Sequence, residues 1–509
     1  MSIQLPSPCL QQIFMWLKYD KDTCFNLCFV NRTWSEVSVL YLYRDPWNLL
    51  LNDRMSQYQR KLAITKLLRT YLSCLEYDSL DPDELDAITT INALCSHVGY
   101  LSRLYLLMQS FFNQINPILD EAELQNTVEV LQSIYYSALN QPSYDYLCLA
   151  RTFDLIGLRD FLCLVKTDPF PFLSSEYTPE EVAVDQKLAL KLWDVTRSRC
   201  GPCITRLAWD ASIPLKSIFP ESMSLCSLKY LEIQWKADYI GHPFDNHLEY
   251  VAKSCRNLEI ICITVESKKI TILDRDLATL IKNQNPGSLK ELRICGVSDQ
   301  LVQTLESLIE QHHDSFSTLK ISRNDSGQIP LSRIAAFPNL KTLELVDCFI
   351  RDRDIEFLAM HGAPLRKIVL RNLRLVTWQS VRKLLRKAGS NLRQLVIDEI
   401  QEHTIDSDTV QAIAQNCQNI RHFQIEMICI DNFDLVQFLR CCHKLRYLSF
   451  GELINNTSSD GDLLVNTILD NCPLLKHLYA PEMVTTESAL QALLQHRELE
   501  KISLPTVLI

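Results

Sequence analysis

The chain has 509 residues, with 51 basic and 61 acidic side chains, a net charge of −10 and a hydrophobic fraction of 47%. This composition is typical of a folded globular protein and excludes a disordered chain. Glycine is scarce, at 11 residues, and neither a G-x-G-x-x-G nor a G-x-x-x-x-G-K-[ST] phosphate loop occurs. The acidic balance argues against a general nucleic-acid binder, which needs a basic surface.

The sequence also argues against membrane insertion and secretion. No apolar run reaches the ~18 residues of a membrane helix, and the N-terminus lacks the basic region and apolar run of a signal peptide. We therefore expect a cytoplasmic or nuclear protein without membrane contact. The 19 cysteines are then expected to be reduced, with many of them buried as small apolar side chains.

The first fifty residues predict a small all-helical unit. Ser7 is a suitable N-cap, Pro8 suits the first helical position, and apolar residues follow at i, i+3, i+4 and i+7. Two further short helices are expected, one near Leu27 and one from Thr33. Such a small unit has a marginal core and leaves large apolar side chains exposed, which favours a protein partner. The alternative is that these helices only begin a larger helical domain.

Residues 51–195 show no repeat. Apolar residues between Leu62 and Leu75 lie on one wide helical face, and acidic residues between Glu76 and Asp86 indicate a solvated turn. Proline residues mark further breaks at Pro117, Pro169 and Pro171. The sequence therefore predicts a mostly helical spacer.

From residue 196 to residue 509 one pattern recurs about twelve times, with an average spacing of about 27 residues. It consists of an apolar residue, two variable residues, an apolar residue, one variable residue and an apolar residue, as in Leu340-Leu343-Leu345. The last two apolar side chains of each unit point to one side of a short strand. Helical patterns such as Val381-Leu384-Leu385 lie between units. Stacked units then form an α/β solenoid, with strands on the concave face and helices outside.

Cysteines support the same register. Four cysteines lie three residues before the first apolar position of a unit, namely Cys255, Cys417, Cys442 and Cys472. Cys348 occupies a later position in the unit, at which leucine-rich repeats carry Asn or Cys. We expect Val297 and Glu399 at this position in two divergent units.

Both ends of the chain resemble parts of one known family. The residues Leu5-Pro6, Leu10, Ile13-Phe14, Leu17, Leu27, Val30-Asn31-Arg32 and Trp34 resemble an F-box, and the C-terminal units resemble the cysteine-containing leucine-rich repeats common in F-box proteins. With Arg44-Asp45-Pro46-Trp47, the whole is similar to fungal F-box proteins with C-terminal leucine-rich repeats. One departure is Ser7-Pro8-Cys9, where an acidic residue usually follows the Leu-Pro pair.

The resemblance implies a non-catalytic substrate-recognition subunit of an SCF-type (Skp, cullin, F-box) ubiquitin ligase. Its F-box would bind a Skp-family adaptor, which bridges to cullin and RING subunits, and its repeats would hold a protein substrate; no cofactor is implied. The adaptor-binding residues would be Leu5, Pro6, Leu10, Ile13, Phe14, Leu17, Leu27, Val30 and Trp34. One alternative is a scaffold that acts outside a cullin complex. Another is a plain repeat protein whose N-terminal helices only cap the array.

Motifs of other chemistries lie in unsuitable contexts. Cys200-Gly201-Pro202-Cys203 spells a dithiol motif, but a helical pattern precedes it and a strand pattern follows it, the reverse of the usual order. Cys441-Cys442-His443 offers adjacent ligands, which rarely close a tetrahedral zinc site, and His312-His313 falls in a polar loop. We therefore expect neither redox chemistry nor a metal.

A basic residue follows the first apolar position in eight units, six of them successive, from Lys341 to Lys476. Stacked units would align these residues into a row that could receive an acidic or phosphorylated segment. The alternative is that a basic residue is simply a soluble choice at this position. Aromatic and imidazole side chains follow in the last units. The candidate substrate-binding residues are Arg366, Arg393, Arg421, His422, Arg446, Tyr447, His477 and Tyr479.

Overall fold

A computed structural model describes Trp34, Ser38 and residues 152–154, 193–194, 203–210, 225–235, 247–266, 274–296, 301–324, 329–454, 457–496 and 498–503. The chain divides into two compact units, Met1–Leu231 and Glu232–Ile509. Most of the F-box-like segment and of the expected spacer therefore lies outside the described residues. No described helix is long and apolar enough to span a bilayer.

In the first unit, two short strands pair in parallel. They are β1 (Thr152–Asp154) and β2 (Arg206–Asp210), and Phe153 lies opposite Leu207. Leu207 and Trp209 are buried. A strand therefore forms at the pattern that begins at Ile204, and another strand lies within the stretch expected to be helical.

The second unit alternates strands and helices. Its strands lie side by side in chain order, with every described pairing parallel: β3 (Tyr230–Trp235), β4 (Ile260–Val265), β5 (Glu291–Cys295), β6 (Thr318–Asn324), β7 (Thr342–Cys348), β8 (Lys367–Leu373), β9 (Gln394–Ile400), β10 (His422–Glu426), β12 (Tyr447–Phe450), β14 (His477–Tyr479) and β15 (Lys501–Ser503). A small second sheet joins β11 (Ile430–Asp431) and β13 (Leu453–Ile454).

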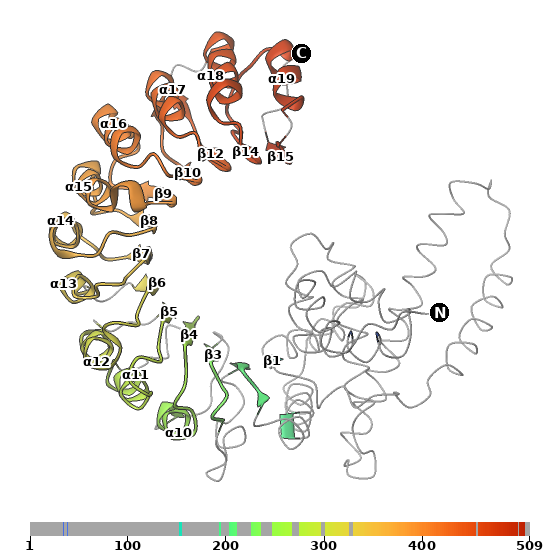
Figure 1. Cartoon of the computed structure of the whole chain (residues 1–509). Coiled ribbons are helices and arrows are strands. Elements are labelled where there is room, and N and C mark those ends of the chain that lie inside the picture. The colour runs from blue at the N-terminus through green and yellow to red at the C-terminus, as the bar shows by residue number, and fades with distance from the viewer. Residues whose placement is uncertain are drawn as a thin grey trace, which may run out of the picture. The chain divides into compact units, whose positions relative to one another are not determined.

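Helices cover the outer side of this sheet. They are α10 (His247–Ser254), α11 (Asp274–Lys282), α12 (Val302–His312), α13 (Leu331–Ile334), α14 (Asp352–His361), α15 (Trp378–Ala388), α16 (Ser407–Asn416), α17 (Asn432–Cys441), α18 (Ser458–Asn471) and α19 (Glu487–Leu494). Figure 1 shows these repeats following an arc, with the strands on its inner side and the helices outside. This confirms the predicted parallel α/β solenoid of the leucine-rich-repeat type.

The core lies between the sheet and the helices. Along β4 and β5, buried and partly exposed residues alternate, and the buried ones are apolar. In β8 and β9 three successive residues are buried. The strand register places the apolar residues of neighbouring repeats opposite one another, so that Leu343 of β7 lies opposite Ile368 of β8. Each helix buries apolar side chains against these rows, such as Leu384 and Leu385 of α15. Stacking therefore buries a face that no single repeat could cover.

The pairing corrects the predicted register of one repeat. Cys348 lies opposite Asn324, and Ile400 lies opposite Leu373. Ile400 therefore occupies the Asn/Cys position, and the prediction of Glu399 was wrong by one residue. The triplet spacing alone does not show where the chain turns out of each strand.

The residue before this position has a left-handed backbone in six units: Gly296 (φ 78°), Arg323 (53°), Asp347 (52°), Asn372 (50°), Glu399 (46°) and Met427 (52°). The turn that ends each strand thus repeats although its sequence varies. Residues other than glycine rarely adopt this backbone conformation. At Gly296 a Cβ would also lie 1.8 Å from the carbonyl oxygen of Val265, so this turn requires glycine.

Candidate functional site

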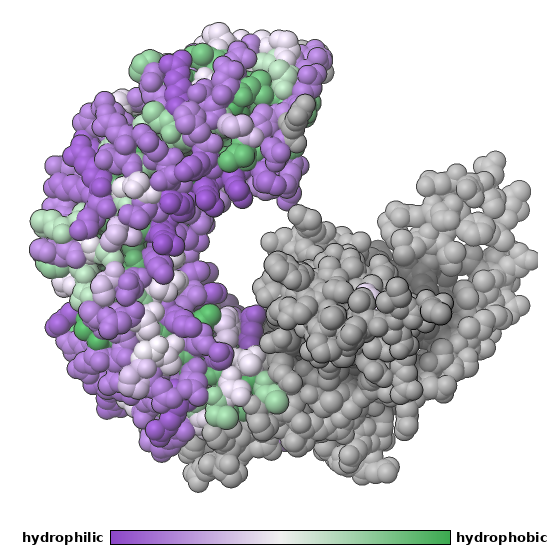
Figure 2. Space-filling model, in the orientation of Figure 1, coloured by the Kyte–Doolittle hydropathy of each residue, from purple (hydrophilic) through white to green (hydrophobic). Residues whose placement is uncertain are grey.

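Two rows of side chains occupy the outward positions of the strands. Because the residues between them are buried, both rows lie on the inner side of the arc. One row contains Glu291, Thr318, Thr342, Lys367, Gln394, His422, Tyr447 and His477. The other contains Arg293, Lys320, Glu344, Val369, Val396, Gln424, Ser449 and Tyr479. The visible inner face is mainly hydrophilic (Figure 2).

From β5 to β8 the charges on this face neutralise one another. Glu291 lies 2.7 Å from Arg293 and 3.6 Å from Lys320. Glu344 lies 3.3 Å from Lys320 and 2.8 Å from Lys367. These five residues, the ion-pair strip, alternate in charge across four strands. Each cation in the strip therefore already has a carboxylate partner.

From β10 to β14 the same face carries rings instead. The rings of His422 and Tyr447 are stacked, with centroids 4.1 Å apart and planes within 4° of parallel. His477 follows at 6.0 Å from Tyr447 and tilted by 50°. These three residues form the ring stack. Neighbouring strands lie about 4.8 Å apart, so rings at paired positions come into contact without distorting the backbone.

His422 is uncharged at neutral pH. Burial lowers the pKa of its imidazole, and electrostatic interactions with Lys367, Arg371 and His477 act in the same direction. The hydrogen bond to Gln424, 3.2 Å from Nε2 of His422 to Oε1, opposes this shift. A neutral tautomer that donates from Nε2 fits this contact. The ring stack thus contributes aromatic surface and polar edges without a positive charge on His422.

An acidic group lies beside the ring stack. Oε1 of Glu426 accepts hydrogen bonds from Nε2 of Gln424 at 2.7 Å and from Oγ of Ser449 at 3.3 Å. Glu426 pairs across the sheet with Asp398, whose carboxyl pKa is raised by burial and then by the charge of Glu426. Negative charge therefore gathers where these strands end.

The predicted basic row is continuous in the backbone. Each N–H donates to the carbonyl of the residue one repeat earlier: Arg366 to Lys341 (2.7 Å), Arg393 to Arg366 (2.7 Å), Arg421 to Arg393 (2.8 Å), Arg446 to Arg421 (2.7 Å) and Lys476 to Arg446 (2.8 Å). Each of these residues directly precedes a strand. We call this row the basic edge.

The side chains of the basic edge differ in their partners. Nζ of Lys476 lies 2.5 Å from Oε1 of Glu500, and Arg393 donates to the carbonyl oxygens of Ser390 (2.6 Å) and Leu392 (3.2 Å). Four others are exposed, and within the described part of the chain they make no ion pair or side-chain hydrogen bond: Lys341, Arg366, Arg421 and Arg446. The structure therefore separates cations that could bind a partner from cations whose side chains are already engaged.

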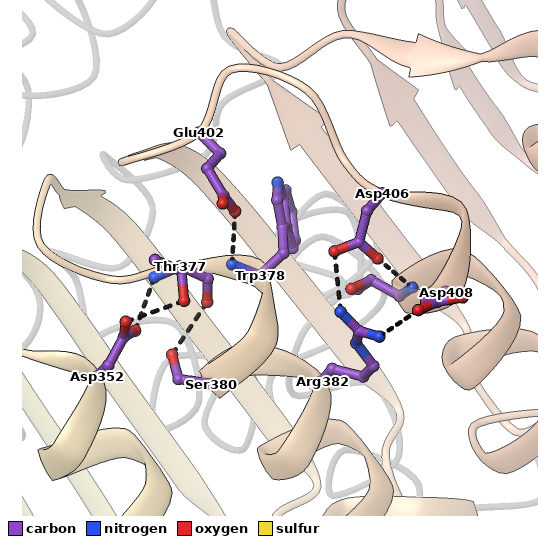
Figure 3. A network of polar contacts seen from close by, with 9 residues as sticks. Asp352, Thr377, Trp378, Ser380, Arg382, Glu402, Asp406 and Asp408 are labelled. Atoms are coloured by element: carbon purple, nitrogen blue, oxygen red, sulfur yellow. Dashed lines mark hydrogen bonds and ion pairs between the residues drawn. The ribbon is translucent and has the colours of Figure 1, made fainter.

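The opposite edge, where helices begin, is acidic and internally satisfied. Asp352 accepts hydrogen bonds from the N–H and Oγ1 of Thr377, at 2.8 and 2.9 Å (Figure 3). Glu402 accepts from the N–H of Trp378 at 2.9 Å. Arg382 bridges two carboxylates of the next repeat (Figure 3), Asp406 at 3.1 Å and Asp408 at 2.6 Å. These carboxylates stabilise helix N-termini and join adjacent repeats, so they have a structural role.

The repeat cysteines are structural too. Cys417 and Cys472 are the C-cap residues of α16 and α18, and their thiols donate to the carbonyls of Leu385 (3.5 Å) and Leu439 (3.9 Å) in the preceding repeats. Burial raises the pKa of both thiols to about 12. A thiol with such a pKa is unreactive near neutral pH.

His312 joins neighbouring repeats in a similar way. Nδ1 accepts from the N–H of Leu289 at 3.4 Å, and Nε2 lies 3.4 Å from the carbonyl oxygen of Ile281. His312 is buried as the last residue of α12, so the prediction that it lies in a polar loop was wrong. Its polar neighbours in sequence gave no signal of this burial.

The other predicted motifs show no assembled chemistry. Among the described residues, no group of three or more His, Cys, Asp or Glu side chains could hold a metal. Cys442 is buried, and Nδ1 of His443 lies 3.0 Å from the carbonyl oxygen of Asn471. Cys203 is exposed and precedes β2, while Cys200 lies outside the described residues.

The predicted adaptor-binding residues fall almost entirely outside the described part. Only Trp34 is described; it is helical and half-buried. All eight candidate substrate-binding residues lie in the second unit. His422, Tyr447 and His477 meet in the ring stack, and Tyr479, 42% exposed, lies beside Ser449 in the other outward row.

No family model matches the sequence. A search of curated proteins likewise gave no match. Among solved structures, the chain is similar to one in the crystal structure of the Rad7 and Elc1 complex in yeast, with 15% identity, a TM-score of 0.45 and coverage of 61% of this chain and 77% of that chain. It is also similar to an internalin (inlF) from Listeria monocytogenes, with 15% identity, a TM-score of 0.35 and coverage of 63% and 78%.

Proposed function

We propose that the chain is a non-catalytic recognition subunit that holds a protein segment against β10, β12 and β14. One observation carries this proposal. The ring stack lies on a regular sheet directly beside exposed arginines that no described carboxylate neutralises. Tyr and Arg are enriched among residues that dominate binding energy in protein interfaces. Because parallel strands fix their backbones, binding orders side chains but not the backbone of this face.

We further propose that the N-terminal segment connects this face to a ubiquitin ligase of the SCF type. The support is the F-box-like pattern, in which Leu5-Pro6 precedes the apolar positions Leu10, Ile13 and Phe14. A Skp-family adaptor would bind this segment and bridge to cullin and RING subunits. The chain would then act by proximity, because it raises the local concentration of a substrate lysine at the charged ubiquitin carrier.

Adaptor binding tests the ligase part of the proposal. Purified Skp-family adaptor is titrated with the full chain and with a Leu5→Ala/Pro6→Ala/Leu10→Ala variant. We expect submicromolar binding by the full chain and loss of binding by the variant. A Tyr447→Ala/His477→Ala variant is the matched control, because it alters only the ring stack and should bind the adaptor normally. A folded full chain that does not bind the adaptor would overturn this part.

The second candidate is a scaffold that binds the adaptor but works outside a cullin complex. It shares every residue of the ring stack and of the F-box-like pattern. Co-purification separates the two, since a ligase receptor brings the cullin with the adaptor and a scaffold brings the adaptor alone.

A further inference from the structure

We infer that the bound segment carries a phosphoryl group, held by Arg421 and Arg446, with a second acidic side chain at Arg366. This inference rests on the proposed role of the concave face in protein recognition and names the class of its partner.

The first step is the spacing of the two arginines. Arg421 and Arg446 occupy successive positions of the basic edge, joined by a backbone hydrogen bond of 2.7 Å. Their backbones are therefore one strand spacing apart, about 4.8 Å. Guanidinium groups on long side chains at this separation can converge on one anion. A phosphoryl dianion offers three acceptor oxygens and pairs with arginine forks, whereas one carboxylate is satisfied by a single arginine.

The second step is the state of the surrounding cations. Lys290 pairs with Glu259 at 2.7 Å, Lys476 pairs with Glu500 at 2.5 Å, and Arg393 donates to backbone carbonyls. The ion-pair strip neutralises Arg293, Lys320 and Lys367. Arg421 and Arg446 are exposed and have no such partner within the described residues. The row therefore contains exposed cations that are available to an anion beside cations that already have a partner.

The third step is what lies next to the two arginines. Arg421 is followed directly by His422 and Arg446 by Tyr447, so the ring stack begins one residue beyond the proposed phosphate site. The rings give apolar area to the residue beside the phosphorylated one. Recognition would then combine an anion with flanking chain, as expected for a protein segment.

The distance between Arg366 and Arg421 predicts how far apart two anionic side chains of the bound segment are. Arg366 lies two strand spacings from Arg421 along the basic edge, about 10 Å. An extended peptide advances about 3.3 Å per residue, so this distance corresponds to about three residues. Arg393, between them, is engaged with carbonyl oxygens. We therefore expect a carboxylate about three residues from the phosphorylated side chain.

The same strands disfavour a long polyanion. Asp398 and Glu426 lie near the far ends of β9 and β10, and the carboxylates of Figure 3 line the edge where helices begin. A nucleic acid that crossed the face would meet this negative charge, and the whole chain carries a net charge of −10. A short anionic segment at the basic edge avoids it.

The test uses the full chain and two degenerate peptide pools, one with phosphoserine at its centre and one with serine. We expect the chain to retain the phosphorylated pool at least about tenfold better, with Asp and Glu enriched three residues from the centre. Arg421→Glu/Arg446→Glu should abolish this preference. The matched control is Arg386→Glu/Arg440→Glu, because both residues are exposed at the ends of outer helices and carry the same charge.

The outcomes distinguish this inference from the proposed function. Equal retention of the two pools would overturn the phosphoryl site, as would equal loss in the control variant or stronger retention of a single-stranded oligonucleotide. Adaptor titration of the same variants reports separately on folding and on the ligase role. If the chain binds the adaptor but shows no preference for phosphoserine, the proposed function stands and only the inference of a phosphorylated partner is overturned.

Discussion

The ion-pair strip and the ring stack lie on the same sheet and differ only in side chains. Both follow parallel strands in an unbroken register. In the strip, every cation is within ion-pair distance of Glu291 or Glu344. Beside the ring stack, Arg421 and Arg446 lack such a partner among the described residues. The same backbone arrangement thus supports one region whose charges are paired with one another and one region that can bind a partner.

A narrow apolar step separates the two regions. Val369 and Val396 occupy outward positions of β8 and β9, yet they are only 7% and 3% exposed. Other residues of the protein therefore cover these two side chains. The charges of the strip end at Lys367, on one side of this step. The ring stack begins at His422, on the other side.

The largest expected effect comes from removing the support of the ring stack. Phe423 is 1% exposed, its ring centroid lies 4.2 Å from that of Phe438, and it lies between His422 and Gln424 in β10. Phe423→Ala should lower the free energy of unfolding by about 3–5 kcal/mol, through lost burial and the remaining cavity. Urea unfolding measures the loss, and hydrogen exchange should place it near β10.

The control for this variant lies under the other region. Leu319→Ala removes a fully buried side chain of β6, with an expected cost of about 2–5 kcal/mol. It should weaken the ion-pair strip and leave retention of the phosphorylated peptide pool intact. If both variants reduced peptide retention equally, the two regions would not be independent.

The second effect breaks the strip itself. The Glu344 side chain is 18% exposed and lies between Lys320 and Lys367. Glu344→Lys would place three ammonium groups together, and we expect a loss of about 2 kcal/mol in the free energy of unfolding. Glu344→Gln should cost less, since it removes the attraction without adding repulsion. Thermal unfolding at low and high salt checks this, because salt should reduce the difference between the variants. No difference between them would show that the strip contributes no net electrostatic stability.

Much of the solenoid could be predicted from the sequence, because each repeat must bury its apolar triplet. The positions of Leu343, Ile368 and Phe423 in the core follow from that requirement. Ile400 was missed because a residue with a left-handed backbone, Glu399, precedes it, and apolar spacing does not record backbone conformation. His312 was missed because its partners are backbone groups outside its own helix, the N–H of Leu289 and the carbonyl oxygen of Ile281 in the preceding repeat.

The candidate site could be predicted only as a row of residues. The sequence gives Arg446 and Lys476 the same place in successive units, and the structure confirms that their backbones stack. Whether such a cation is neutralised depends on a residue about one repeat away, as with Glu500 and Lys476. The reach of a side chain decides that pairing, and no periodicity encodes it.

A smaller effect concerns pH. Burial lowers the pKa of His422 below its ordinary value of 6.5, so the folded state resists protonation. As the pH falls below 6.5, His422 becomes protonated in the unfolded chain before it does so in the folded chain. The stabilisation is therefore complete above pH 6.5 and is lost as the pH falls toward the folded pKa. His422→Gln should make the free energy of unfolding less dependent on pH over this window, as measured by urea titrations at several pH values.

His312 provides the comparison for that measurement. Burial also lowers the pKa of His312, so His312→Gln should reduce the pH dependence in the same direction. It should not affect peptide retention, because His312 lies between α11 and β5, away from the ring stack. An unchanged profile for His422→Gln would contradict the account of the ring stack.

The smallest effect concerns the difference between paired and unpaired cations. The side chains of Lys476 and Glu500 are 37% and 48% exposed, so their ion pair should contribute less than about 1 kcal/mol. Because this charge is already neutralised, Lys476→Gln should change retention of the phosphorylated peptide pool by less than about twofold. Arg446→Gln, one repeat earlier in the same row, should reduce it several-fold. Equal effects of the two substitutions would show that the whole basic edge acts as a diffuse positive field. A larger effect of Arg446 would show that the carboxylate partner of each cation determines where an anion binds.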